Sequence, residues 1–127
     1  MPTPDALREL VTRYAAAVTA RDVDAVVALF TEDAVQTDPA TAPPNIGHAA
    51  IRAFLQSAVD ASTGTRFEVL DAHTCGDRIA VDFRVTVSIE GGTMTISGIE
   101  VFTVADDGRI REVTAYWDDA DVVIDAG

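Results

Sequence analysis

The chain has no lysine, only one cysteine and only two histidines among its 127 residues. Without lysine, no side chain can form a Schiff base with a carbonyl substrate. Cys75 has no partner for an internal disulfide, and one cysteine with two histidines cannot supply a cysteine–histidine metal cluster. The motifs GxGxxG, GxSxG and the P-loop are also missing. We therefore expect an activity that needs neither a metal nor a cofactor.

Long apolar segments are absent as well. No run approaches the ~20 residues that a membrane-spanning helix needs. The N-terminus lacks the basic start and apolar core of a signal peptide. With 48% hydrophobic residues and a mean hydropathy of +0.17, the sequence predicts one globular domain over residues 1–127. We expect a cytoplasmic protein that does not associate with membranes.

Positive charge is scarce. The net charge is −12, from 21 acidic residues and nine arginines. Nucleic acids and anionic membrane surfaces are bound through clustered cations. The charge balance therefore predicts no nucleic-acid partner, and much of the acidic excess is expected to serve solubility.

Apolar residues recur at helical spacing in three segments of the N-terminal half. The first covers residues 4–20 and places Tyr14 on its buried stripe. Asp22 is a suitable cap for the second, which we expect to include Phe30 on its apolar face. The third covers residues 48–59.

Apolar residues alternate with polar ones from residue 65 onward, which is typical of strands. Strands are predicted over residues 79–90, 93–104 and 109–117, joined by glycine-containing turns. A short strand is also expected from Ala34 towards Asp38. The order predicts an α+β fold, with three N-terminal helices packed on a curved antiparallel sheet.

Glu100 stands out within the strand at 93–104. It is in phase with Phe102 and Ile96, while Ile99 and Val101 occupy the other face, so neither side of the strand is clearly solvated. A carboxyl group without a cation in an apolar site has a raised pKa and tends to be neutral. A core carboxylate that is hydrogen-bonded, or paired with an arginine, would give the same pattern, and both interpretations stay open here.

Asp38 and Tyr14 are each unremarkable alone. Asp38 precedes a proline in a common turn dipeptide, and Tyr14 fits a helix stripe. Combined with Glu100, they supply a base, a phenol and an acid. These groups can remove a proton next to a carbonyl and hold the resulting oxyanion. Candidate apolar walls of a substrate pocket are aromatic or flexible side chains: Phe54, Phe83, Met94 and Trp117.

Short landmarks along most of the chain carry a resemblance to a known family. They are Arg13-Tyr14, Asp33-Ala34, Thr37-Asp38-Pro39, Pro43-Pro44, Ile46-Gly47, Ala53-Phe54, Phe83-Arg84-Val85, Gly108-Arg109-Ile110 and Ala115-Tyr116-Trp117. The sequence resembles the bacterial ketosteroid isomerases of the NTF2-like, SnoaL-like superfamily. The interval of 24 residues from Tyr14 to Asp38 is similar to that between the family's oxyanion-hole tyrosine and its catalytic aspartate.

The resemblance implies a cone-shaped α+β fold, a homodimer and an apolar pocket. Tyr14 would donate to the 3-oxygen of a steroid, Asp38 would be the base, and Glu100 would replace the family's protonated aspartic acid. Glu100 is one methylene longer than that residue. Phe30 and Leu55 stand where some relatives have tyrosines that hydrogen-bond to the oxyanion tyrosine.

The expected reaction is the cofactor-free isomerisation of a small hydrophobic ketone, a Δ5-3-ketosteroid, to the conjugated enone. A polyketide cyclase of the same superfamily and a non-catalytic module that binds small hydrophobic ligands are the alternatives. Epoxide hydrolysis in the superfamily uses an Asp-Arg-Asp arrangement. Arg84 falls on a polar strand face, so the sequence offers no good candidate for that arginine.

Overall fold

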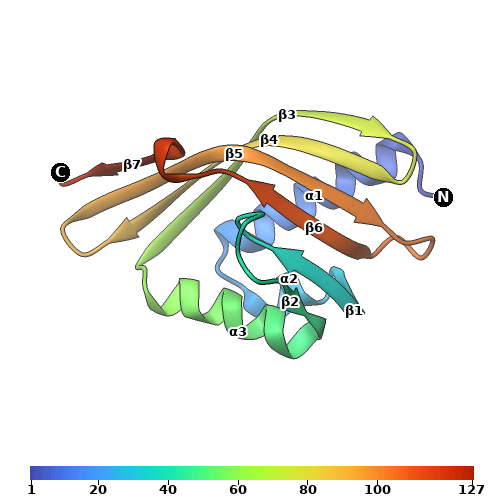
Figure 1. Cartoon of the computed structure of the whole chain (residues 1–127), viewed down its shortest axis with the longest axis horizontal. Helices are drawn as coiled ribbons and strands as arrows, with labels where there is room; N and C mark the ends of the chain where they lie inside the picture. Colours follow the sequence, from blue (N-terminus) through green and yellow to red (C-terminus); the bar gives the residue numbers. More distant parts are fainter.

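A computed structural model describes all 127 residues. The helices are α1 (Pro4–Thr19), α2 (Val23–Val27) and α3 (Gly47–Asp60). The strands are β1 (Phe30–Thr37), β2 (Asn45–Ile46), β3 (Gly64–Cys75), β4 (Arg78–Ile89), β5 (Gly92–Val104), β6 (Ile110–Tyr116) and β7 (Val122–Asp125). Figure 1 shows them as one curved sheet with the helices, which confirms the expected α+β fold.

The sheet has the order β2-β1-β6-β5-β4-β3, with β7 pairing to β5. All pairs are antiparallel except β1 with β6, which is parallel. The expectation of an antiparallel sheet is therefore wrong at this pair. The chain leaves β1 through β2 and α3, runs through three antiparallel strands, and returns in β6 along the direction of β1.

The first two helices begin directly after capping residues, of which Asp22 was predicted. Thr3 Oγ1 accepts a hydrogen bond from the Ala6 amide at 3.1 Å, and Asp22 Oδ1 accepts one from the Ala25 amide at 3.1 Å. The second helix is shorter than expected, because Phe30 belongs to β1. Its backbone pairs with Ile110 of β6 and its side chain is fully buried, so sheet pairing outweighs the helical pattern.

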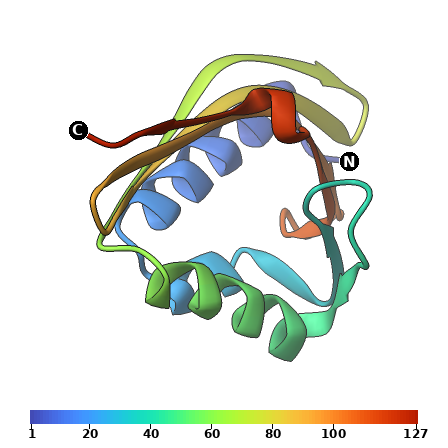
Figure 2. The same cartoon turned by 60° about the vertical axis from the view of Figure 1, so that its left-hand side comes forward.

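The hydrophobic core lies between the helices and the concave face of the sheet. α1 packs on β3, and α3 packs on β1 (Figure 2). The alternation predicted for residues 79–90 is present in β4, where Ile79, Val81 and Phe83 are buried. The buried face of α1 contributes Tyr14 to the same core cluster.

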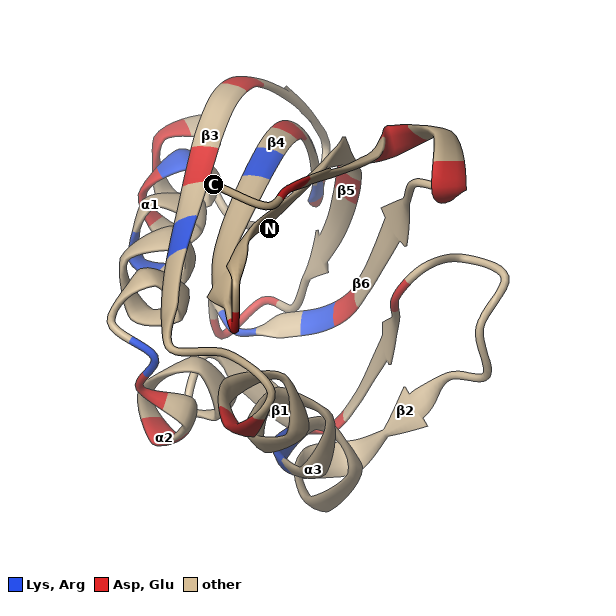
Figure 3. Cartoon of the chain, turned by 90° about the vertical axis from the view of Figure 1, so that its left-hand side faces the viewer, with Lys and Arg blue, Asp and Glu red and all other residues tan.

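The C-terminal strand and the distribution of arginines are two further features of the fold. The C-terminal β7 was not predicted; it extends the sheet by pairing with β5 from Thr93 to Ile96. Arginines are distributed over α1, α3 and several strands without gathering on one face (Figure 3). No helix is long and apolar enough to cross a membrane.

Candidate active site

The strand register determines which side chains share a row on the concave face. Glu100 of β5 lies opposite Ala115 of β6. On the other side of β6, Thr37 pairs with Thr114, so the next residue, Asp38, lies beside Ala115. Asp38 and Glu100 therefore flank a residue whose side chain is a single methyl group. The two backbones are about 10 Å apart, twice the spacing of neighbouring strands, which leaves room for a ligand between the carboxyl groups.

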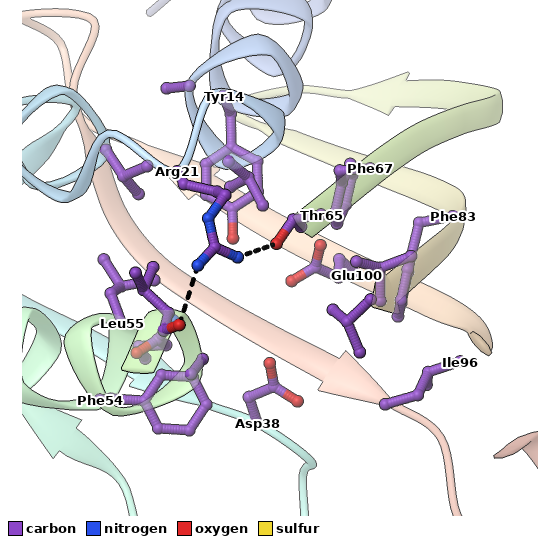
Figure 4. A pocket seen from close by; sticks show the side chains of 18 of the residues that line it. Tyr14, Arg21, Asp38, Phe54, Leu55, Thr65, Phe67, Phe83, Ile96 and Glu100 are labelled. Atoms are coloured by element: carbon purple, nitrogen blue, oxygen red, sulfur yellow. Dashed lines mark hydrogen bonds between the residues drawn. The ribbon is translucent and has the colours of Figure 1, made fainter. Parts of the chain in front are cut away.

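These residues open onto a cavity of about 390 Å³ that has 16 hydrophobic residues among its 23 lining residues. The helices supply one wall and the concave face of the sheet supplies the other. All seven residues that the sequence singled out line this cavity: Tyr14, Asp38, Phe54, Phe83, Met94, Glu100 and Trp117. Figure 4 shows Tyr14, Asp38 and Glu100 directing their oxygen atoms into the same space.

Glu100 is the most unusual group in the cavity. It is 4% exposed and makes no hydrogen bond or ion pair with the protein, and its Oε1 is completely buried. Glu100 is therefore neither a hydrogen-bonded carboxylate nor paired with an arginine, the two ordinary interpretations of the sequence pattern. Burial, and to a lesser extent the charge of Asp38, raises the pKa of Glu100 from 4.5 to about 8. Glu100 is consequently a neutral acid near pH 7 and carries an O–H that can be donated.

Asp38 has a different environment. The indole Nε1 of Trp117 donates a hydrogen bond to Asp38 Oδ1 at 2.7 Å. Burial raises the pKa of Asp38, and this hydrogen bond opposes the rise by favouring the carboxylate. Sequence analysis expected Trp117 only as an apolar wall. Its donor role was missed, because Trp117 lies just beyond the end of β6, and the alternation predicted for residues 109–117 gives the direction of a side chain but not the position of its N–H.

Tyr14 presents a free hydroxyl group. Its ring packs edge-on against Phe102 and Phe67, with centroids 5.1 and 5.6 Å away, and its hydroxyl forms no hydrogen bond within the protein. Burial and the nearby carboxyl groups of Glu100 and Asp38 raise the pKa of Tyr14 well above 10. The hydroxyl therefore remains protonated and can donate to a ligand.

Arg21 also lines the cavity and was not predicted. It has a left-handed backbone, with φ of 59°, which is uncommon for a residue other than glycine. Its guanidinium donates to the carbonyl oxygens of Val59 and Ser62 at 2.9 Å, and also to the hydroxyls of Ser62 (2.8 Å) and Thr65 (3.2 Å). Figure 4 shows the hydrogen bond from the guanidinium group of Arg21 to the hydroxyl group of Thr65.

Arg21 lies between α1 and α2, and its hydrogen bonds connect this turn to the end of α3 and the start of β3. The carbonyl groups at a helix C-terminus are a favourable place for a cation. It forms no ion pair with Asp38 or Glu100, so the cavity does not contain an Asp-Arg-Asp arrangement. The only hint in the sequence was its place directly before the helix cap Asp22.

Comparison with known proteins defines the family. Residues 11–113 match the SnoaL-like domain family. The chain belongs to this family. It is 31% identical to a steroid Δ-isomerase of Nocardioides simplex over 118 residues, which cover 93% of this chain and 94% of that protein. The similarity to steroid isomerases expected from the landmarks is therefore confirmed.

Other SnoaL-like relatives have different activities. The chain is 30% identical to the epoxide hydrolase LasB of Streptomyces lasalocidi over 125 residues, but it spans only 43% of that protein. The structure of SalBIII, an epoxide hydrolase/cyclase-like enzyme in pyran ring formation, matches with a TM-score of 0.89, 27% identity and coverage of 98% and 99% of the two chains. The structure of RV0760c from Mycobacterium tuberculosis matches with a TM-score of 0.88 and coverage of 98% and 100%; at 19% identity it shows the fold alone. The isomerase, the hydrolase and the cyclase-like relative support an enzyme of this superfamily.

The buried acid predicts a specific dependence of stability on pH. Glu100 has a pKa near 4.5 when exposed and about 8 in the folded protein. Between these values the unfolded chain releases a proton that the folded protein keeps, so the free energy of unfolding falls as pH rises through this window. Glu100→Gln removes this loss. In urea unfolding, the free energy of unfolding of the variant should rise relative to that of the wild type between about pH 5 and about pH 8, by up to ~1.4 kcal/mol per pH unit.

Glu112→Gln is the matched control, because Glu112 is exposed on β6. Its difference from the wild type should stay nearly constant over the same pH range. A Glu100→Gln difference that is equally constant would contradict the buried neutral acid.

Proposed function

We propose that the protein is a cofactor-free isomerase that converts a Δ5-3-ketosteroid into the conjugated Δ4 ketone. One observation carries the proposal: Glu100, a neutral acid without a protein partner, faces the same apolar cavity as the hydrogen-bonded carboxyl group of Asp38. Two titratable groups in different environments within one cavity are typical of acid–base catalysis.

The proposed reaction moves one proton. Asp38 removes it from the carbon between the ketone and the β,γ double bond, and the electron pair of that C–H bond delocalises into a dienolate. The dienolate oxygen accepts hydrogen bonds from the hydroxyl of Tyr14 and the protonated carboxyl group of Glu100. Asp38 then returns the proton to the γ carbon. No bond to the enzyme forms, and no water or redox partner is consumed.

The shape and polarity of the cavity support this chemistry. Its volume of about 390 Å³ lies in the range of small-molecule sites, ~300–1,000 Å³. Phe54, Phe83 and Met94 contribute apolar wall, which suits a hydrocarbon skeleton with few polar groups. Donors in such a dry site stabilise developing charge more strongly than donors in water. The relative from Nocardioides simplex supports a steroid as the substrate class.

Asp38→Asn tests the base. The purified variant and the wild type are mixed with a Δ5-3-ketosteroid, and the absorbance of the conjugated enone is followed. Because the amide cannot accept the proton, turnover should fall by at least ~10²-fold, while the affinity for a phenolic steroid is retained. Turnover of the variant at the wild-type rate would contradict the role of Asp38.

Glu100→Gln and Glu100→Ala together test the neutral acid. The glutamine amide can still donate, whereas alanine cannot, so alanine should lose ~10²–10³ in turnover and glutamine clearly less. The same absorbance assay measures both variants. A glutamine variant as inactive as the alanine variant would contradict donation by a neutral Glu100.

An epoxide-opening cyclase is the second candidate. It is favoured by the positions of Asp38 and Glu100 on either side of Ala115 and by the likeness to SalBIII. In that reaction Asp38 would take the proton of a substrate hydroxyl while the hydroxyl oxygen bonds to an epoxide carbon. The epoxide C–O bond at that carbon would break, and Glu100 would give its proton to the released oxygen. Binding of a phenolic steroid without conversion of the Δ5-3-ketosteroid would favour this cyclase or a non-catalytic binding module. Absence of binding would mean that the steroid assignment is wrong.

We further propose that the protein forms a homodimer through the convex face of the sheet. Ile99 and Tyr116 lie opposite each other there and are 41% and 53% exposed. Val123 pairs with Thr95 on the same face and is 63% exposed. Large exposed apolar side chains on one face of a sheet are typical of protein interfaces.

Sedimentation equilibrium tests the dimer. The wild type should sediment as a dimer, and Ile99→Asp should shift the equilibrium towards the monomer, because it would bury a charge at the contact. A wild-type monomer at high micromolar concentration would contradict the proposal.

A further inference from the structure

The cavity contains one more polar side chain, Gln36, which the isomerisation does not use. Gln36 belongs to β1 and is 3% exposed. It pairs with Val113 of β6, and Val113 pairs with Phe102 of β5. This row of side chains neighbours the row of Asp38, Ala115 and Glu100. The amide group therefore lies next to the reacting groups, on the strand that leads to Asp38.

The hydrogen bonds of Gln36 leave its donor free. Its Oε1 accepts a long hydrogen bond, 3.5 Å, from Asn45 Nδ2 of β2. Because this contact occupies the oxygen, Nε2 is the atom left for the cavity that Gln36 lines. Nε2 donates to no protein atom. An unpaired amide donor in a largely apolar site is unfavourable until a ligand or a water accepts its hydrogen bond.

The position of Gln36 limits what it can reach. Gln36 and Asp38 are two residues apart on one face, so their backbones are ~7 Å apart. The side chain of Gln36 is one methylene longer than that of Asp38, and its amide can extend towards the substrate atoms that Asp38 serves. A ligand oxygen at that point would be separate from the one held by Tyr14 and Glu100.

We propose that Gln36 is a specificity-determining residue that donates a hydrogen bond from Nε2 to a second oxygen of the substrate, close to the reacting ketone. The preferred substrates are then polycyclic ketones that carry a hydroxyl or carbonyl group beside the ketone-bearing ring position. This inference rests on the proposed function, because it places the ketone at Tyr14 and Glu100.

Three phenolic steroids test the proposal by binding alone: estradiol, 2-hydroxyestradiol and 4-hydroxyestradiol. The phenol takes the place of the dienolate, and the added hydroxyl lies on one side of it or the other. The fluorescence of Trp117, the single tryptophan, provides the binding signal. The wild type should bind one of the two catechols about fivefold more tightly than estradiol, the effect of one net hydrogen bond.

Gln36→Met is the test variant, because methionine keeps an unbranched side chain of similar length without a donor. It should bind estradiol and lose the catechol preference, and its estradiol binding shows that the cavity is intact. Gln56→Met is the matched control: it makes the same substitution at an exposed glutamine of α3 outside the cavity, so it should preserve the affinity ratio.

Absence of a catechol preference in the wild type, or an unchanged preference in Gln36→Met, would overturn the inference. Those results leave the proposed function intact if the Δ5-3-ketosteroid is still converted. A Gln36-dependent preference without conversion would instead support the inference and count against the isomerase. Failure of the wild type to bind any of the three probes would overturn the steroid assignment and this inference together.

Discussion

The site depends on keeping the carboxyl group of Glu100 away from water and away from any cation. Burial of an ionised carboxylate is costly, so the group retains its proton and its pKa rises to about 8. The apolar wall around it and the lack of an arginine within reach are therefore as important as the residue itself. Asp38 is less buried and accepts a hydrogen bond from Trp117 that favours its carboxylate, so the two carboxyl groups of one cavity have different environments.

Patterns along the chain predicted much of this arrangement. The helical spacing of α1 placed Tyr14 on the buried face, and the alternation in β5 placed Glu100 among apolar residues. Both patterns are local, because the direction of a side chain follows from the periodicity of its own element. All seven selected residues line one cavity. Predicting this also required the family resemblance, because periodicity alone does not show which separate elements come together.

The features that were missed depend on partners distant in the sequence. Phe30 was expected in a helix, and its strand conformation follows from pairing with Ile110, 80 positions further along the chain. The parallel pairing of β1 with β6 has the same origin. Arg21 adopts a left-handed backbone where it can reach the end of α3, and nothing in its immediate neighbours marks that geometry. Local propensity carries little information about such contacts.

β6 lies between the strands that carry the two carboxyl groups, although it follows both of them in the sequence. Until residues 110–116 are added, β1 and β5 have no common neighbour, and Asp38 and Glu100 belong to separate parts of the chain. Contacts of such long range form late, because a large loop must close first. On the ribosome, a nascent chain that has not yet released β6 would therefore contain Tyr14, Gln36, Asp38 and Glu100 without having an assembled site.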